Sequence, residues 1–420
     1  MRRKTSRSVM RLMVRRPSGL TLVLRNRPFG RFWLARTASH IGDGAAVIAL
    51  LLYVRGIERS GIAVGVLLLA QALPHLAGPV MGTLVDRLDL KWVLIVCDLA
   101  QAVLFAAIAW WQPPFVALLA VVAIASLFDT TYSPASGSMV PQLVSDADLV
   151  QANAWMGTAL NFQVAVGPLL GGLLVSAFGV RGGLGANAAS FLISAALILT
   201  VPRLGPARTK PADGVMSAGL AGLVFAWKDA AIRALVIGVF LLVAFAAVDN
   251  VALVFLTRDS LHLNATGFGM VAGAFGFGML ASSVGLLAWR RAPRPAAILV
   301  VSWFLTAVSM LLTGLAPNGP AAGAAQALGG VGNGAENVAL DTLVQRIVPA
   351  PMLGRVFGLV GTVAFLGSSL AYVLAGVLLD LTSPRTTFIV GGCGSLLVVL
   401  VLAPILWRLL SRVAGAPQVP

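Results

Sequence analysis

Five carboxylates lie inside apolar stretches of this 420-residue sequence, at Asp43, Asp98, Asp129, Asp249 and Glu336. A charged side chain surrounded by hydrocarbon is costly, so such residues usually face a cavity or a partner group. They commonly mark the path of a substrate or a proton. Proton transfer and ligand binding are therefore the chemistry that these positions could carry.

Asp43 stands in a row of ionisable residues. It follows Arg31 by twelve residues, which places it roughly 18 Å along a helix, near the middle of a bilayer. Arg36, His40 and Asp43 fall on one helix face because successive members are four and three residues apart. Histidine titrates near neutral pH, so the row could carry protons. Alternatively, Asp43 pairs with Arg36 or His40 in a purely structural seam.

Three further groups of polar residues lie within apolar stretches, each within about one helical turn. They are Asp129 with Tyr132, Asp249 with Asn250, and Asn333 with Glu336 and Asn337. The last group lies in a glycine-rich stretch, where small residues admit either a ligand or a neighbouring helix. Lining of a cavity and packing between helices remain alternatives for these groups.

Two other polar residues have structural interpretations. Asp98 lies only seven residues beyond Lys91, close to the expected membrane surface, so we expect it to pair with Lys91 or Arg87. His75 directly follows Pro74, where the missing backbone donor predicts a kink with a satisfied histidine.

The sequence offers little support for soluble-enzyme chemistry. No lysine follows a glycine, so there is no phosphate-binding loop and ATP is not the expected direct energy source. The histidines at 40, 75 and 262 are too scattered for an HExxH zinc helix, and the two cysteines form no CxxC pair. We expect no enzymatic activity, no metal and no cofactor.

The elements that must position these residues are membrane helices. The sequence is 58% hydrophobic and 11% charged, with a mean hydropathy of +0.92, whereas a soluble domain has about a quarter of its residues charged. The net charge of +15 comes from residues that flank apolar stretches. Lipid is therefore an expected partner, and nucleic acid is not.

A helix needs about 20 residues to cross the hydrocarbon core. Twelve stretches are long enough: 31–54, 61–84, 91–111, 114–140, 149–177, 182–201, 233–257, 265–289, 295–315, 319–344, 354–380 and 386–410. We expect an all-α integral membrane protein with five parts. These are a basic arm (1–30), a six-helix half (31–201), a linker with a possible interfacial helix (202–232), a second half (233–410) and a tail (411–420).

Basic residues are distributed unevenly around these spans. With the amino terminus in the cytoplasm, 24 Lys and Arg residues outside the spans or at their ends fall on the cytoplasmic side and five on the other. Cytoplasmic loops of membrane proteins carry such an excess. Both termini and the linker are therefore expected in the cytoplasm.

Short motifs recur between the two halves. Gly157-Thr158 returns as Gly361-Thr362, and Gly172-Leu-Leu returns as Gly376-Val-Leu, both 204 positions later. Duplication of one membrane unit produces such recurrences, together with a pseudo-two-fold axis.

The loop after the second span reads Gly82-Thr-Leu-Val-Asp86-Arg87-Leu-Asp89-Leu-Lys91. With twelve spans in two halves, it resembles the major facilitator superfamily, whose loop pattern is G-x-L-a-D-R-x-G-R-K. Asp89 and Leu90 depart from that pattern. The resemblance implies two pseudo-symmetric six-helix bundles, with Asp86 contacting the start of the eleventh span. The gating residues that it implies are Gly82, Asp86, Arg87, Lys91, Asp98, Gly354 and Arg355.

Other segments narrow the resemblance to the drug- and siderophore-exporting branch, which includes macrolide efflux proteins and the enterobactin exporter. They are Pro134 to Val144, Leu149 to Ala154, Gln345 to Pro349 and Leu353 to Gly358. Gly167-Pro168-Leu-Leu-Gly171-Gly172 matches the end of a motif associated with antiporters. This motif implies helix bending, and tight helix packing is the alternative.

The resemblance implies a secondary transporter that works by alternating access and exports drugs, macrolides or siderophores in exchange for protons. The expected partners are a small-molecule substrate, protons and lipid, and the expected unit is a monomer in the bacterial cytoplasmic membrane. The alternatives are an importer or facilitator of a small metabolite, and a non-transporting receptor or scaffold.

Overall fold

The structure is a computed structural model that describes residues 21–85, 87–202, 223–288, 294–349 and 352–414, and this part of the chain is helical without strands. The helices before the linker are α2 (Thr21–Arg25), α3 (Arg27–Glu58), α4 (Gly61–Ala72), η1 (Leu73–Ala77), α5 (Gly78–Val85), α6 (Leu90–Trp111), α7 (Phe115–Leu143), η2 (Asp146–Asp148), α8 (Leu149–Ala165) and α9 (Gly167–Leu199). Those after it are α11 (Ala230–Ala246), α12 (Asp249–Phe255), η3 (Leu256–Ser260), α13 (Ala265–Ala288), α14 (Pro295–Leu315), α15 (Gly319–Ile347), α16 (Leu353–Leu381) and α17 (Pro384–Ala414).

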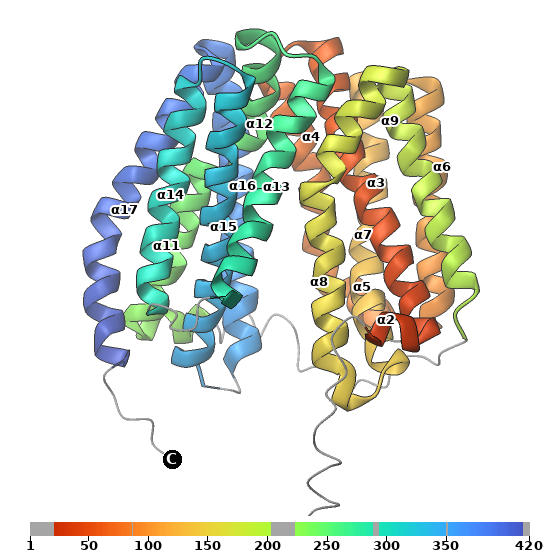
Figure 1. Cartoon of the computed structure of the whole chain (residues 1–420), viewed down its shortest axis with the longest axis horizontal. Helices are drawn as coiled ribbons and strands as arrows, with labels where there is room; N and C mark the ends of the chain where they lie inside the picture. Colours follow the sequence, from red (N-terminus) through yellow and green to blue (C-terminus); the bar gives the residue numbers. More distant parts are fainter. Residues whose placement is uncertain (1–20, 86, 203–222, 289–293, 350–351, 415–420) are drawn as a thin grey trace, which may run out of the picture.

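These helices supply the twelve predicted crossings. Nine helical stretches of the described chain are long and apolar enough to cross a membrane. One of them, Asp146–Leu199, has 54 residues and crosses twice, because the chain turns back in α9, where Gly179 has a φ of 70° (Figure 1). Glycine adopts such a φ without steric cost. The second span (61–85) and α15 complete the set.

Two of the crossings are interrupted. The second changes from α4 to the 3-10 helix η1 around Pro74, so the helix is interrupted at the proline, as predicted. The seventh breaks between α11 and α12 and ends in η3, a π-helical turn. Such turns often occur at functional sites.

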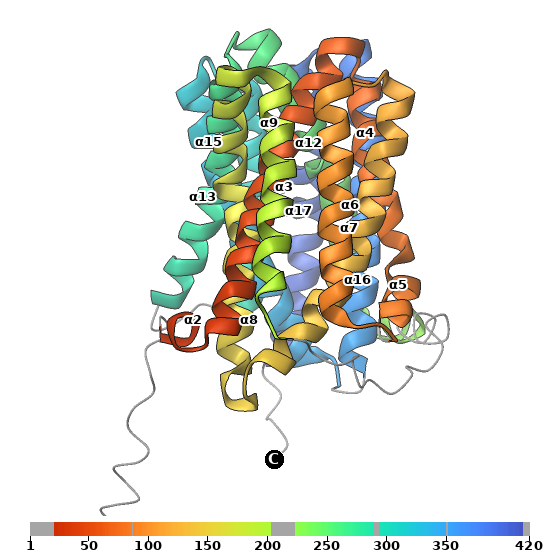
Figure 2. The ribbon, with the colours of Figure 1, turned by 90° about the vertical axis from the view of Figure 1, so that its right-hand side faces the viewer.

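The helices form two bundles, α2–α9 and α11–α17 (Figure 1). The bundles converge at one end of the molecule, here called the closed end. They separate at the other, the tail end, where α2 begins and α17 finishes. Figure 2 shows the first bundle in front, with α2 and α5 at the tail end.

The hydrophobic core is likewise shared by the two halves at one end and separate at the other. At the closed end, one cluster of buried side chains joins both halves and includes Val54 of α3 and Val254 of α12. Toward the tail end, Phe29 and Trp303 belong to separate clusters, one in each half. Within the described chain, the halves therefore share a core at the closed end and not at the tail end.

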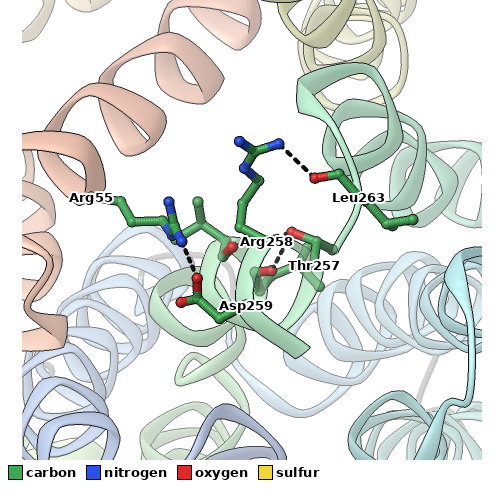
Figure 3. A network of polar contacts seen from close by, with 7 residues as sticks. Arg55, Thr257, Arg258, Asp259 and Leu263 are labelled. Carbon is green, nitrogen blue, oxygen red and sulfur yellow. Dashed lines mark hydrogen bonds and ion pairs between the residues drawn. The ribbon is translucent and has the colours of Figure 1, made fainter. Parts of the chain in front are cut away.

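An ion pair joins the halves at the closed end. Arg55, near the end of α3, pairs with Asp259 of η3 (Figure 3). The neighbouring Arg258 donates from Nη1 to the Leu263 carbonyl over 2.5 Å, which holds the turn before α13 in place. Arg55 and Asp259 are 204 positions apart, the same offset that separates the sequence repeats.

Two helix caps also cross between the halves. The Asp380 carboxylate of α16 accepts hydrogen bonds from the backbone N–H of Gly61 at 2.6 Å and of Ile62 at 3.4 Å, at the start of α4. Ser176 Oγ of α9 accepts one from the Thr266 N–H at 2.9 Å, at the start of α13. Asp380 and Ser176 occupy equivalent positions of the repeat, as do Ile62 and Thr266. The closed end is thus built from duplicated contacts.

Candidate functional site

A cavity of about 700 Å³ lies between the two halves. Its walls come from α3, α8 and α9 of the first half and from α11 to α16 of the second. Its volume falls within the range of about 300–1,000 Å³ that is usual for drug-sized ligands. Mostly apolar walls with a few polar groups are also typical of small-molecule sites.

The cavity brings together two of the predicted polar groups. They are Asp249 with Asn250, and Asn333 with Glu336 and Asn337. Gln326 of α15 donates from Nε2 to Asp249 Oδ1 over 2.9 Å. This hydrogen bond ties α12 to α15 and fixes the position of the Asp249 carboxylate on the cavity wall.

Glu336 is the most buried carboxylate of this wall, with 7% of the residue exposed. The indole N–H of Trp303 in α14 donates to Glu336 Oε1 over 2.8 Å. Glu336 also lines the cavity, so its carboxylate can interact with a bound ligand as well as with Trp303.

Several polar residues of the cavity were not predicted, including Asp341, Gln163 and Gln326. One pattern could have found Asp341, because Asn333, Asn337 and Asp341 follow at intervals of four, which places them on one helix face. Gln163 and Gln326 are single amides in apolar surroundings, and their spacing gives no comparable signal.

The other predicted residues form a separate network in the first half and do not line the cavity. The Arg36 guanidinium carbon of α3 lies 4.3 Å from the centroid of the Tyr132 ring of α7, a cation–π contact. His40 is buried one turn further along α3.

Asp43 belongs to this network but is not paired as the structural alternative suggested. Asn187 of α9 donates from Nδ2 to Asp43 Oδ1 over 3.5 Å. The ion pairs of the described chain include none between Asp43 and Arg36 or His40, and the proton-carrying and structural interpretations of this row both stay predictions. Its neighbour Gly44 lines the cavity.

Asp129 also finds its partner outside the cavity. His75 Nε2 lies 3.3 Å from Asp129 Oδ2, which joins η1 to α7. His75 Nδ1 lies 3.1 Å from the Gln71 carbonyl. The prediction of a satisfied histidine beside Pro74 is therefore confirmed, with Asp129 as its partner.

The expected pairing of Asp98 with a basic residue of the loop is wrong. Asp98 is fully buried and accepts a hydrogen bond from Ser194 Oγ of α9 at 2.7 Å. Lys91 Nζ instead donates to the carbonyls of Leu199 and Val201, at 2.8 and 2.6 Å. The reason is that the end of α9 offers unpaired carbonyls and a negative dipole, which attract a lysine.

Comparison with known proteins agrees with this architecture. The sequence profile of the transmembrane secretion effector family, a branch of the major facilitator superfamily, matches residues 20–414. The chain belongs to the major facilitator superfamily.

Relatives place this major facilitator protein in the branch of drug and siderophore exporters. It is 27% identical over 362 residues to the multidrug efflux pump Tap of Mycolicibacterium fortuitum, covering 83% of this chain and 88% of Tap. It is 25% identical over 397 residues to the enterobactin exporter EntS of Salmonella choleraesuis, covering 93% of this chain and 95% of EntS. The nucleoside transporter NupG shares the fold, with a TM-score of 0.72 at 15% identity over 90% of this chain and 98% of NupG.

The superfamily's gating loop is only partly within the described residues. Asp86 lies outside them, so its contact near Gly354 stays a prediction. Both departures from the family pattern have structural roles, since Asp89 Oδ1 accepts a hydrogen bond from the Lys91 N–H at 3.0 Å and caps α6. Leu90 is fully buried in the core of the first half. The remaining gating residues lie at the tail end: Gly82, Arg87, Gly354 and Arg355.

The motif of the fifth span packs against both halves. Gly167 begins α9 one residue after α8 ends at Ala165. A Cβ added to Gly171 would lie 2.7 Å from the Ala45 Cα of α3, and one added to Gly172 would lie 2.9 Å from the Gly269 Cα of α13. Pro168 lines the cavity. The glycines thus permit close helix contact, and a bending role stays a prediction.

Proposed function

We propose that this transporter exports small amphiphilic molecules, such as drugs or siderophores, across the bacterial cytoplasmic membrane in exchange for protons. The observation that carries the proposal is a cavity between two halves that share a core at one end only. The efflux relatives Tap and EntS, which match over most of their length, support the direction of transport.

The transport cycle that we propose consists of opening the closed end and closing the tail end. Opening of the closed end would break Arg55–Asp259 and the Asp380 cap, and closing of the tail end would bring the gating loop to the start of α16. Substrate bound in the cavity is then reachable from one side at a time, which is alternating access. The excess of basic residues around the tail end supports a cytoplasmic location for it. The conformation described here is then open toward the cytoplasm, and we propose the monomer as the functional unit.

Proton exchange is proposed to run through the first-half network, with Asp43 as the group that gains and loses the proton. Asp43 is held by a neutral amide, and Arg36 and His40 share its helix face. This arrangement lets a carboxylate respond to changes in its surroundings, since no ion pair fixes its charge.

Reconstitution tests the function directly. The purified protein is placed in liposomes that contain a pH-sensitive dye, and a panel of drugs and siderophores is supplied with and without a pH gradient. We expect uphill movement of at least one compound together with counter-movement of protons. Movement of substrate without protons would indicate a facilitator, and accumulation in the opposite direction would indicate an importer.

A further inference from the structure

We propose that the central cavity selects organic cations over anions of the same size, with Asp249, Glu336 and Asp341 facing the positive charge. The inference rests on the proposed function, because it names the chemical class of substrate for that same cavity. Two observations support it. The ionisable groups on the cavity wall are carboxylates, and the side chains that donate hydrogen bonds to them are neutral.

Ionisable groups are present on one wall of the cavity only. Asp249 of α12 and Glu336 and Asp341 of α15 are its ionisable lining residues, and no Arg, Lys or His of the described chain lines it. The opposite wall, from α3, α8 and α9, consists of apolar side chains such as Leu51, with Gln163 as its polar side chain. A bound molecule therefore meets carboxylates on one side and hydrocarbon on the other, which fits an amphiphile with a positive head.

Within the part of the chain that the structure describes, no cationic side chain pairs with these carboxylates. The ion pairs of the described chain join Arg25 to Asp148, Arg55 to Asp259 and His75 to Asp129, all outside the cavity. The donors on the wall are neutral, with the Trp303 indole on Glu336 and the Gln326 amide on Asp249. A buried negative charge without a counterion is costly, so a cationic ligand gains by supplying it and an anionic ligand adds to the cost.

The carboxylates of α15 also form a path into the cavity. Glu336 is buried, whereas Asp341 is exposed and lies closer to the tail end. Five residues separate them, which is about 7.5 Å along the helix axis. A cation that enters from the tail end meets Asp341 first and then Glu336, so the attraction continues from the entrance to the interior. Phe268 and Phe275 line the cavity as well and can receive the apolar part of the molecule.

Two ions of the same shape and opposite charge provide the test. Tetraphenylphosphonium and tetraphenylborate each carry four phenyl groups around a central atom. Equilibrium dialysis against the purified full-length protein in detergent, with protein-free detergent as the blank, measures both dissociation constants. We expect the phosphonium to bind at least about ten-fold more tightly than the borate, because its charge is opposite to that of the wall. Equal binding, tighter binding of the borate, or binding of neither ion would overturn the proposal.

Variants test whether the carboxylates of the cavity cause the preference for the phosphonium. Glu336→Gln keeps the size and an oxygen for the Trp303 N–H, and we expect it to weaken phosphonium binding about ten-fold because it removes a negative charge from the wall. Asp341→Asn changes an exposed residue without disturbing the core, and its phosphonium affinity is the measurement to use if Glu336→Gln does not fold. Asp148→Asn is the matched control, because it removes a carboxylate far from the cavity. Unchanged phosphonium affinity in both cavity variants would overturn the proposal.

Failure of this inference differs from failure of the proposed function. Transport of an anionic or neutral compound in liposomes, without phosphonium binding, would overturn the charge selection and leave transport in place. Absence of transport for every compound of the panel would overturn the proposed function, whichever ion binds.

Discussion

Asp43 faces the Asn187 amide between α3 and α9, and its neighbour Gly44 lies on the cavity wall. An amide can donate to a charged carboxylate or accept from a protonated one, depending on which way it is turned. This partner therefore accommodates both protonation states, whereas an arginine would hold Asp43 in its charged state. These properties suit a residue that exchanges protons with each side in turn.

Asp43→Asn removes the titrating group and keeps its shape. We expect this variant to bind substrate and to exchange it passively, while uphill export driven by a pH gradient falls to the level of protein-free liposomes. Both activities are measured in the same proteoliposome preparation, with Asp148→Asn as the control. Full uphill export by Asp43→Asn would assign the coupling role elsewhere, with Asp129 or Glu336 as the next candidates.

The sequence predicted individual polar residues better than their partners. The group around Glu336 was found because its members share one turn of an apolar helix. The partners of Asp98 and Asp43 could not be found, since Ser194 and Asn187 lie 96 and 144 positions away. Such pairs depend on which helices pack side by side, and a single sequence carries no signal of that packing at these positions.

At the scale of elements, the capping of α4 by Asp380 couples a helix end to the conformation of the whole protein. The first N–H groups of a helix lack partners within it, and its amino terminus attracts negative charge. In α4, the carboxylate comes from the other half, so the interaction exists only while the closed end is closed. Its equivalent on α13 uses the neutral Ser176 hydroxyl.

Asp380→Asn should therefore shift the protein away from the conformation described here. A carboxylate at a helix amino terminus contributes about 1 kcal/mol, or about a five-fold change in population. Spin labels at Ala147→Cys and Arg346→Cys, both exposed at the tail end, should report a larger fraction of short distances. Ser176→Ala is the matched comparison and should shift the distribution less, because it removes no charge. An unchanged distribution in Asp380→Asn would exclude this cap as a stabiliser of the closed end.

Asp86→Asn should act in the opposite direction. By the family resemblance, Asp86 holds the tail end closed through the start of α16 near Gly354, where unpaired N–H groups favour an anion. We expect the variant to fold, to transport more slowly and to populate the open tail end more often in the same spin-label measurement. Unchanged transport and unchanged distances would mean that the loop, with Asp89 and Leu90, has lost its gating role.

The positions of the membrane-spanning helices could be predicted from the lengths of the apolar stretches. The interruption at Pro74 could be predicted from the proline itself. The break between α11 and α12 was not predicted, because the sequence there is Ala246-Ala247-Val248 and has neither glycine nor proline. The repeated glycines indicated duplication, but the sequence did not explain why glycine stands at these positions. The structure explains it, because Gly172 packs on α13 and Gly376 packs on α4. Both are places where the halves meet and a larger side chain would not fit.

At the scale of the whole molecule, the tail end and the closed end are expected on opposite sides of the membrane. The test uses a background in which Cys97 and Cys393 are replaced by Ala. Arg181→Cys near the closed end and Lys228→Cys near the tail end are both exposed. An impermeant maleimide added to intact cells should label position 181 and spare position 228 until the membrane is opened. The reverse pattern would invert the proposed topology.

Asp259 and Asp380, which hold the halves together, are exposed at the closed end. With the proposed topology, this face can be reached from outside the cell. An antibody fragment that contacts both halves there would lock the protein in its present conformation without entering the cavity. Inhibition of this kind does not compete with substrate, so its strength would be the same for every compound that the protein carries.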